Sequence, residues 1–148
     1  MSKPEAVPFE TTLVVRDTCV CLHVQRAARA LARHFDEALR PVGLTNGQFS
    51  LMMSLNRADP AGMGAIAELL AMDRTTLTAA LKPLERRGLV EIAVDPGDRR
   101  SRLLTLNAAG RAMLARALPI WKREHAAVEA RLPAADPNRL RQDLRALS

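Results

Sequence analysis

Hydrophobic residues recur with the 3.6-residue period of an α-helix over most of this 148-residue chain. The period predicts one long helix over about 18–39, and another that starts after Asn107, runs to about 131 and is bent or broken near Pro119. Leucines three and four positions apart over 140–147 predict a short terminal helix, whose apolar stripe must pack against another surface. The chain is therefore predicted to be mainly helical.

Shorter helical segments follow one another in the middle of the chain. Thr45 and Gln48 have the spacing of a capping box, which predicts that a helix starts at Thr45. The composition of residues 63–71 predicts a second short helix. Asp73 is a suitable N-cap for a third, and Gly88 stands where a left-handed C-cap would end it.

The two faces of the helix predicted over 73–88 differ in character. Leu77, Leu81 and Leu84 lie at i, i+4 and i+7, so they form one buried stripe. The opposite face is short, rich in hydroxyls and positively charged, which suits the DNA major groove. Its candidate DNA-binding residues are Arg74, Thr75, Thr76, Thr78 and Lys82. The alternative is an ordinary amphipathic surface helix, whose last turn Pro83 is expected to bend.

A β-hairpin with a basic tip is predicted next. Residues 89–94 and 103–106 have the β-branched and aliphatic composition of strands, and a Pro-Gly pair lies in the tip over 95–102. Arginines at such a tip suit phosphates or the DNA minor groove, because unpaired guanidinium groups are costly to bury. The candidate DNA-binding residues here are Asp98, Arg99, Arg100 and Arg102. The alternative is a solvated, charged turn.

Two helices with a tight connection, followed by a hairpin with a basic tip, make a winged helix-turn-helix. With these elements in order, the chain resembles the MarR family of bacterial transcriptional regulators over most of its length. The resemblance lies in residues 44–51, in the recognition helix over 73–88, in the wing signature at 98–100 and in the strand-to-helix exit at 106–110. Asn107 replaces a Thr that is frequent in the family, and both residues cap helices.

The resemblance implies a homodimer that binds pseudo-palindromic double-stranded DNA, and we expect it to act as a repressor. It also implies that Asp98 braces the wing while Arg100 enters the minor groove, and we expect Arg99 and Arg102 at phosphates. Ala79 and Ala80 lie where many relatives have polar or basic residues. Base readout from the middle of this helix is therefore expected to be sparse.

A single domain over 1–148 is implied as well. It comprises a loose tail over 1–10, a winged helix-turn-helix over 45–106, and dimerisation helices over 18–40 and 107–148. Dimerisation matters because one good base contact gives only about 1–3 kcal/mol of discrimination. Two copies double the contacts and place half-sites ~34–36 Å apart. Packing of the terminal helices within one chain is the alternative.

The composition favours a nucleic-acid partner. The net charge is +6, and the residues are 48% hydrophobic but only 3% aromatic, so a polyanionic partner and an aliphatic core are expected.

No spacing typical of an enzyme stands out, and no cofactor is expected. Without a membrane span or a signal segment, we expect a cytoplasmic, reduced protein with no membrane partner. The rival hypothesis is a winged-helix module for non-specific DNA binding or protein contacts, without a sensor role.

Cys19 and Cys21 are candidate redox sensors. If a helix capped by Asp17 or Thr18 contains them, both thiols lie in its first turn near the positive end of the dipole, which raises thiol reactivity. Oxidation would then give a sulfenic acid, a mixed disulfide or an intersubunit bridge, since an intramolecular disulfide would be strained. The alternatives are two small core residues, or, if the segment is extended, a metal site that also uses His23.

A small aromatic effector is the other candidate signal for release of the DNA. The resemblance implies that it binds between the DNA-reading and dimerising parts. The candidate lining residues of that pocket are Arg16, His23, Phe49 and Met52. Trp121, the one Trp of the chain, is expected to anchor the dimer core rather than to stack on a ligand.

Overall fold

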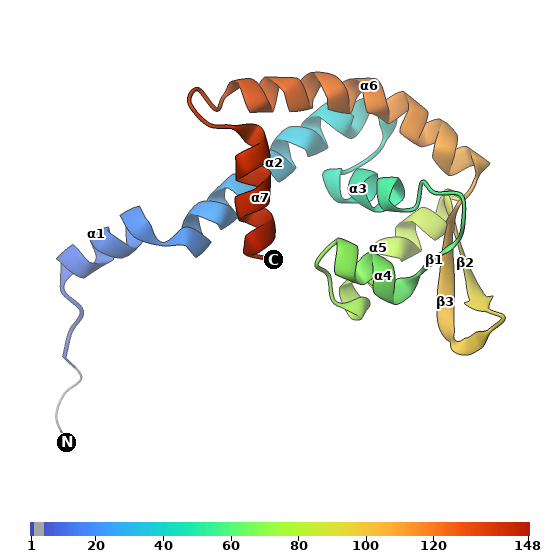
Figure 1. The fold of residues 1–148 in the computed structure, drawn as a ribbon, viewed down its shortest axis with the longest axis horizontal. Helices are drawn as coiled ribbons and strands as arrows, with labels where there is room; N and C mark the ends of the chain where they lie inside the picture. Colours follow the sequence, from blue (N-terminus) through green and yellow to red (C-terminus); the bar gives the residue numbers. More distant parts are fainter. Residues whose placement is uncertain (2–4) are drawn as a thin grey trace. The chain divides into compact units, whose positions relative to one another are not determined.

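The computed structural model describes residue 1 and residues 5–148, which form two compact units, Met1–His34 and Phe35–Ser148 (Figure 1). The fold is mainly helical with one small antiparallel sheet, so the predicted fold class is confirmed. Residues 2–4 of the expected tail over 1–10 lie outside the described residues. The end of that tail is predicted wrongly, because helix α1 (Phe9–Thr18) already begins at Phe9.

The chain up to Leu39 contains two helices where the sequence predicted one, and the boundary between the two units lies within the second helix. Between α1 and α2 (Val20–Leu39), Cys19 has an extended backbone with φ −68° and ψ 109°. The Thr18 hydroxyl donates to a carbonyl one turn earlier in α1 at 2.6 Å, so Thr18 does not cap α2. The predicted cap at Asp17 or Thr18 is wrong, since the Cys19 sulfur accepts from the Leu22 N–H at 3.4 Å and takes that place.

The second unit contains the winged helix-turn-helix. A 3₁₀ turn at Arg40–Val42 is followed by α3 (Asn46–Ser54), β1 (Ala61–Gly62), α4 (Met63–Leu69), α5 (Arg74–Arg86), β2 (Val90–Asp95), β3 (Asp98–Leu106), α6 (Ala108–Ala130) and α7 (Pro137–Ala146). The antiparallel strands lie in the order β1-β3-β2. Figure 1 shows the β2–β3 hairpin beside α4 and α5. β1 was not predicted, because its two residues are too few to show alternation; pairing of Ala61 with Leu104 fixes it.

Helix ends form where the sequence predicted them. In the capping box of α3 the Gln48 N–H donates to the Thr45 hydroxyl, and the Thr45 N–H donates to the Gln48 side chain, both at 3.1 Å. Asp73 caps α5 and Asn107 caps α6 through side-chain oxygens. Gly88 has a φ of 71°, the left-handed conformation that ends a helix readily only with glycine.

The core of the second unit is aliphatic. Leu77, Leu81 and Leu84 of α5 are fully buried, as their spacing predicted. They pack in one cluster with residues of α3, the sheet and α6. Gly110, in the first turn of α6, lies so close to β3 that a Cβ there would collide with the Leu106 side chain and the carbonyl oxygen of Leu89.

The C-terminal helices leave part of their apolar surface open. α6 continues through Pro119 and is curved in Figure 1, so the predicted bend is present and a break is not. α7 is joined to α6 by the Arg141–Glu129 ion pair at 2.7 Å. Leu140, Leu144 and Leu147 of the predicted stripe nevertheless remain 39%, 41% and 64% exposed. Over residue 1 and residues 5–148, no helix combines the length and hydrophobicity needed to cross a membrane.

Candidate nucleic-acid interface

The outward face of α5 forms an open surface. Its leucine stripe faces the core and so fixes which side chains point to solvent. Seven of these line a shallow hollow: Arg74, Thr75, Thr78, Ala79, Lys82, Pro83 and Arg86. Within the described part of the chain, the side chains of Arg74, Thr75 and Lys82 have no hydrogen-bond or ion-pair partner. Their donors are available to a polyanion.

Asp73 and Thr76 hold the start of α5. The Asp73 carboxylate accepts from the Thr76 N–H at 2.7 Å and from the Thr76 hydroxyl at 3.0 Å. These bonds, the backbone one first, hold the pKa of the Asp73 carboxyl below its ordinary value. Thr76 is among the predicted DNA contacts, but its hydroxyl hydrogen serves the cap.

The wing turns more tightly than the sequence predicted. Pro96 and Gly97 alone separate β2 from β3, and Val94 pairs with Arg102. The expected tip over 95–102 is therefore too long, because strand pairing takes up its second half. A register shift follows Val94, and the Asp95 carboxylate accepts from the Gly97 N–H at 2.9 Å.

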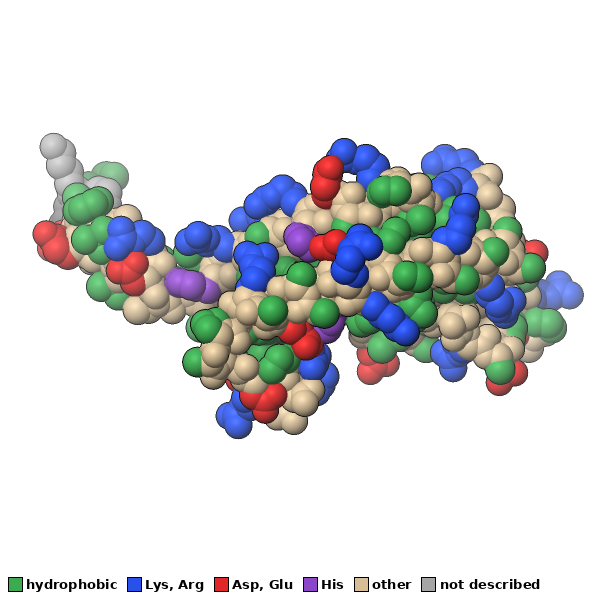
Figure 2. Space-filling model, turned by 90° about the horizontal axis from the view of Figure 1, so that it is seen from above, with side chains coloured by type: hydrophobic (Ala, Val, Ile, Leu, Met, Phe, Trp, Pro, Cys, Tyr) green, Lys and Arg blue, Asp and Glu red, His purple; other side chains and the backbone are tan. Residues whose placement is uncertain are grey.

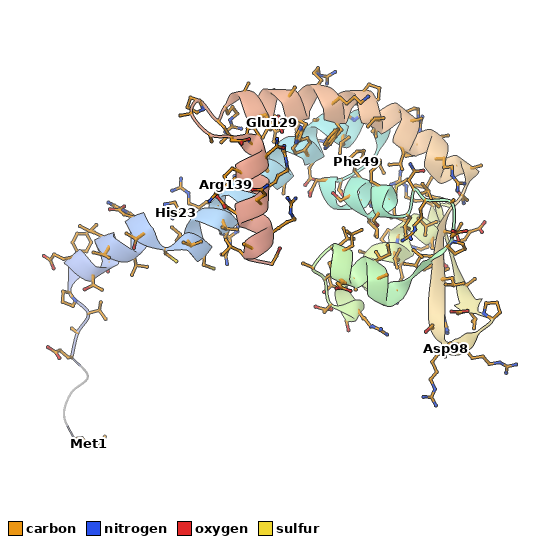
Figure 3. The ribbon with its side chains drawn as sticks, viewed as in Figure 1. Met1, His23, Phe49, Asp98, Glu129 and Arg139 are labelled. Atoms are coloured by element: carbon orange, nitrogen blue, oxygen red, sulfur yellow. The ribbon has the colours of Figure 1, made fainter. Side chains whose placement is uncertain are left out.

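Asp98 and the three arginines of the wing have different partners. Asp98, at the end of the hairpin in Figure 3, accepts from the Arg100 N–H at 3.0 Å and from the Ser101 hydroxyl at 3.1 Å. Arg102 donates to the carbonyl oxygens of Arg99 and Ser101 at 3.2 and 3.3 Å. Among the described residues, the guanidinium groups of Arg99 and Arg100 have no partner, and both are exposed.

α5 and the wing border one recess. Its lining residues are Gly62, Met63, Gly64, Arg74, Thr78, Asp95, Arg100, Ser101 and Arg102. The structure thus brings Arg74 of α5 and Arg100 of β3 to one recess. Basic side chains also lie elsewhere: Figure 2, seen from above, shows them spread over the face that α6 forms. The recess is distinguished by unpartnered arginines from two elements, not by charge alone.

A separate hollow of about 420 Å³ opens at α3, α4 and α6. It is lined by Phe49, Ser50, Met53, Ser54, Leu69, Leu118 and Trp121. The structure places the predicted pocket residue Phe49 here, whereas the prediction for Met52 is wrong. Met52 is fully buried in the core while Met53 is 39% exposed, because consecutive helical residues point about 100° apart.

Trp121 packs within its own chain at this hollow. Its ring stacks on Phe49 with the centroids 6.2 Å apart, and on His125 with the centroids 4.6 Å apart. The indole therefore forms one wall of the hollow. Its expected place in a dimer core stays a prediction.

The other two predicted pocket residues belong to the N-terminal unit. The Arg16 guanidinium donates to the Asp17 carboxylate at 2.7 Å, which raises the pKa of Arg16 and lowers that of Asp17. His23 Nδ1 lies 2.7 Å from the Cys19 carbonyl oxygen (His23 is labelled in Figure 3). Both residues have partners inside Met1–His34, and their part in a pocket stays a prediction.

The two thiols occupy different settings. Cys21 is exposed in the first turn of α2, and its sulfur accepts from the Gln25 side chain at 3.3 Å. Cys19 is half-buried and precedes the helix, so the prediction that both thiols lie in the first turn is wrong for Cys19. Neither is a core residue. Across the described ranges, no three His, Cys, Asp or Glu residues are grouped so as to hold a metal ion.

Known proteins resemble this chain in sequence over its middle. The MarR family model matches residues 44–101. The transcriptional activatory protein BadR of Rhodopseudomonas palustris is 34% identical over 89 residues, which are 58% of this chain and 51% of BadR. The repressor NicR of Pseudomonas putida is 30% identical over 94 residues, 62% of this chain and 60% of NicR. The match thus spans half to three-fifths of these relatives.

Solved structures extend the likeness to most of the chain. The M. tuberculosis regulator MosR in complex with DNA is 39% identical, with a TM-score of 0.79 over 87% of this chain and 92% of MosR. The repressor CouR bound to a 23-mer DNA duplex is 32% identical, with a TM-score of 0.70 over 90% of this chain and 92% of CouR. Together with the winged helix-turn-helix, these matches show that the chain belongs to the MarR family, whose members are DNA-binding transcriptional regulators and not enzymes.

Proposed function

We propose that the chain binds a pseudo-palindromic operator as a homodimer, with α5 in the major groove and the wing in the minor groove. The observation that carries this proposal is the shared recess, where unpartnered arginines of α5 and β3 lie on one side of the fold. Arg100 enters the minor groove, where narrow A·T tracts attract arginine. Arg74 and Lys82 flank the base-reading part of α5, and Arg99 and Arg102 meet phosphates.

A second copy of the chain is the expected cover for its open apolar surfaces. Leu140 and Leu144 on α7 support this, as do Phe9, Val14 and Val15 on α1, all well exposed. Burial of such side chains stabilises a complex by roughly 25 cal/mol for each Å² of apolar surface that is removed from water. Two copies also supply the second half-site contact that a single recognition helix lacks.

Replacement of Arg100 by Ala tests the groove assignment. We expect Arg100→Ala to weaken binding to the duplex upstream of the chain's own gene by about tenfold or more, and to reduce the slope of log K against log salt by about one. Arg145→Ala removes the same charge from α7 and is the matched control. Equal affinities for wild type, Arg100→Ala and Arg145→Ala would remove Arg100 from the interface.

A small aromatic ligand in the hollow beside Trp121 is the first candidate signal for release. The apolar wall and the Phe49–Trp121 stack favour a flat, aromatic guest. Because Trp121 is the one Trp of the chain, benzoate binding should quench its fluorescence in a saturable way. Ser50→Phe, which fills the hollow from α3, should abolish the saturation. Saturable quenching that persists in Ser50→Phe would place the ligand elsewhere.

Thiol oxidation is the second candidate signal, favoured by the exposure of Cys21 and by the place of Cys19 at the cap of α2. A peroxide would convert a thiol to a sulfenic acid with release of water. At Cys19 this would change the sulfur that accepts from the Leu22 N–H. We expect peroxide to release the operator from wild type and less so from Cys19→Ser or Cys21→Ser. Equal release from all three proteins would exclude the thiol switch.

A further inference from the structure

The middle of the α5 face has an unusual set of side chains for a base-reading helix. Between Arg74 and Lys82, which are about 12 Å apart along the axis, the outward positions are threonine and alanine. The whole of α5 contains no Asn or Gln, the residues that pair with both polar atoms of an adenine edge. No side chain of α5 can therefore recognise adenine through the two hydrogen bonds that Asn or Gln would form.

The threonine hydroxyls are partly committed to the helix itself. The Thr78 hydroxyl donates to the Arg74 carbonyl oxygen at 2.8 Å, and the Thr76 hydroxyl donates to Asp73 at 3.0 Å. With its hydrogen used in this way, Thr78 cannot donate to guanine O6 or N7. What Thr78 offers to a ligand is its methyl group and the remaining lone pair of its oxygen.

Ala79 extends this methyl surface. It is exposed, and it lines the same hollow as Thr75 and Thr78. Methyl groups of Ala and Thr complement the C5-methyl group of thymine, and a hydroxyl oxygen can accept from the exocyclic amine of the paired adenine. The unpartnered Arg74 and Lys82 at the two ends supply the attraction to the DNA that brings this surface against the base edges.

We propose that the middle of α5 recognises thymine methyl groups through Thr78 and Ala79, so that each half-site has A·T pairs under the centre of the helix. The inference rests on the proposed operator binding and adds the base class to it. Specificity at this point comes from a methyl contact rather than from a bidentate hydrogen bond. A buried methyl group is worth about a fourfold change in affinity.

The test starts from duplexes that the full chain selects out of a random DNA pool. Each thymine of the selected half-site is then replaced by uracil, which removes the methyl group alone. We expect about fourfold weaker binding for one or two adjacent positions per half-site, and no change for thymines outside the half-sites. No loss at any half-site thymine, or G·C pairs under the centre of α5, would overturn the proposal. If the pool yields no duplex bound better than random DNA, operator binding fails and the methyl contact falls with it.

Two variants of Thr78 separate the methyl group from the hydroxyl. Thr78→Val keeps a methyl surface and should bind the thymine duplex within about twofold of wild type. Thr78→Ser keeps the hydroxyl and should bind it about fourfold more weakly, with a smaller loss on the uracil duplex, since the methyl contact is already gone. Thr45→Ser makes the same change at a helix cap and should leave both affinities unchanged. Loss in Thr78→Val but not in Thr78→Ser would assign recognition to the hydroxyl.

Discussion

The two compact units of the chain differ in what their apolar residues contact. Every buried hydrophobic side chain of the described residues lies at or after Leu39, within Phe35–Ser148. In the described part of Met1–His34 no hydrophobic side chain is buried, and most large apolar residues are exposed, among them Phe9 at 69% and Val15 at 52%. Phe35–Ser148, called the reading unit below because it contains α5 and the wing, thus has its own core, whereas the described part of Met1–His34 has none. We infer that folding and DNA reading reside in Phe35–Ser148, and that assembly depends on the exposed apolar side chains of α1 together with those of α7.

The largest expected effect is loss of core packing in the reading unit. Leu81→Ala should lower the free energy of unfolding by about 2–5 kcal/mol, because Leu81 is fully buried. Val15→Ala, at a position that is exposed in the single chain, should change it by no more than about 0.5 kcal/mol at low protein concentration. Urea denaturation at several concentrations measures both. If Leu81→Ala and Val15→Ala lowered the free energy of unfolding equally at every protein concentration, the division between the two units would be contradicted.

Gly110 provides a sharper test of packing where α6 leaves the sheet. Gly110→Ala should destabilise by about 1–3 kcal/mol, since the new Cβ meets the Leu89 carbonyl and the Leu106 side chain. Gly47→Ala is the matched control: it lies in α3 with open space around its Cα, and should stabilise by about 0.5–1 kcal/mol. Thermal unfolding of both variants checks the opposite signs. A neutral Gly110→Ala would mean that α6 packs less closely than described.

Ala71, in the turn between α4 and α5, has a φ of 51°, which is unfavourable for a residue with a side chain. Ala71→Gly should therefore stabilise the reading unit by about 1 kcal/mol. The same alanine-to-glycine exchange at Ala28, inside α2, should destabilise by a similar amount. The melting temperature should therefore be higher than that of wild type for Ala71→Gly and lower for Ala28→Gly. A lower melting temperature for Ala71→Gly would show that the turn is not strained.

The smallest expected effect concerns the cap of α5. Because the folded pKa of Asp73 is lowered, its stabilisation is present above the ordinary value of 3.8 and is lost as the pH falls through the lowered pKa. Asp73→Ala should lower the melting temperature at neutral pH and reduce its fall on acidification. Asp17→Ala removes an exposed pair with its neighbour Arg16 and should change both much less. A wild-type acid response in Asp73→Ala would exclude the cap as its source.

The sequence predicted the reading unit well, because its signals are local. The caps at Thr45, Asp73 and Asn107 and the leucine stripe of α5 each depend on residues within one or two turns. The recess between Arg74 and Arg100 could not be predicted in this way, since it depends on the pairing of β1 with β3.

Two errors at the candidate sensor have a similar cause. Met52 was predicted at the pocket where the structure places Met53. Hydrophobicity cannot tell which of two consecutive methionines of α3 faces the core and which faces the hollow. The break between α1 and α2 at Cys19 contains no Pro or Gly that would predict it. α2 starts instead with a hydrogen bond from the Leu22 N–H to the Cys19 sulfur, and cysteine is not among the residues that predict an N-cap.

Sequence-specific reading by α5 and the wing is tested most directly by one equilibrium measurement. The affinity of the full chain is determined for a selected duplex and for a scrambled duplex of the same length and base composition, at one salt concentration. We expect the selected duplex to bind at least about a thousandfold more tightly than the scrambled one. Equal affinities for the two duplexes would contradict it, and would leave a winged-helix module that binds DNA through charge alone.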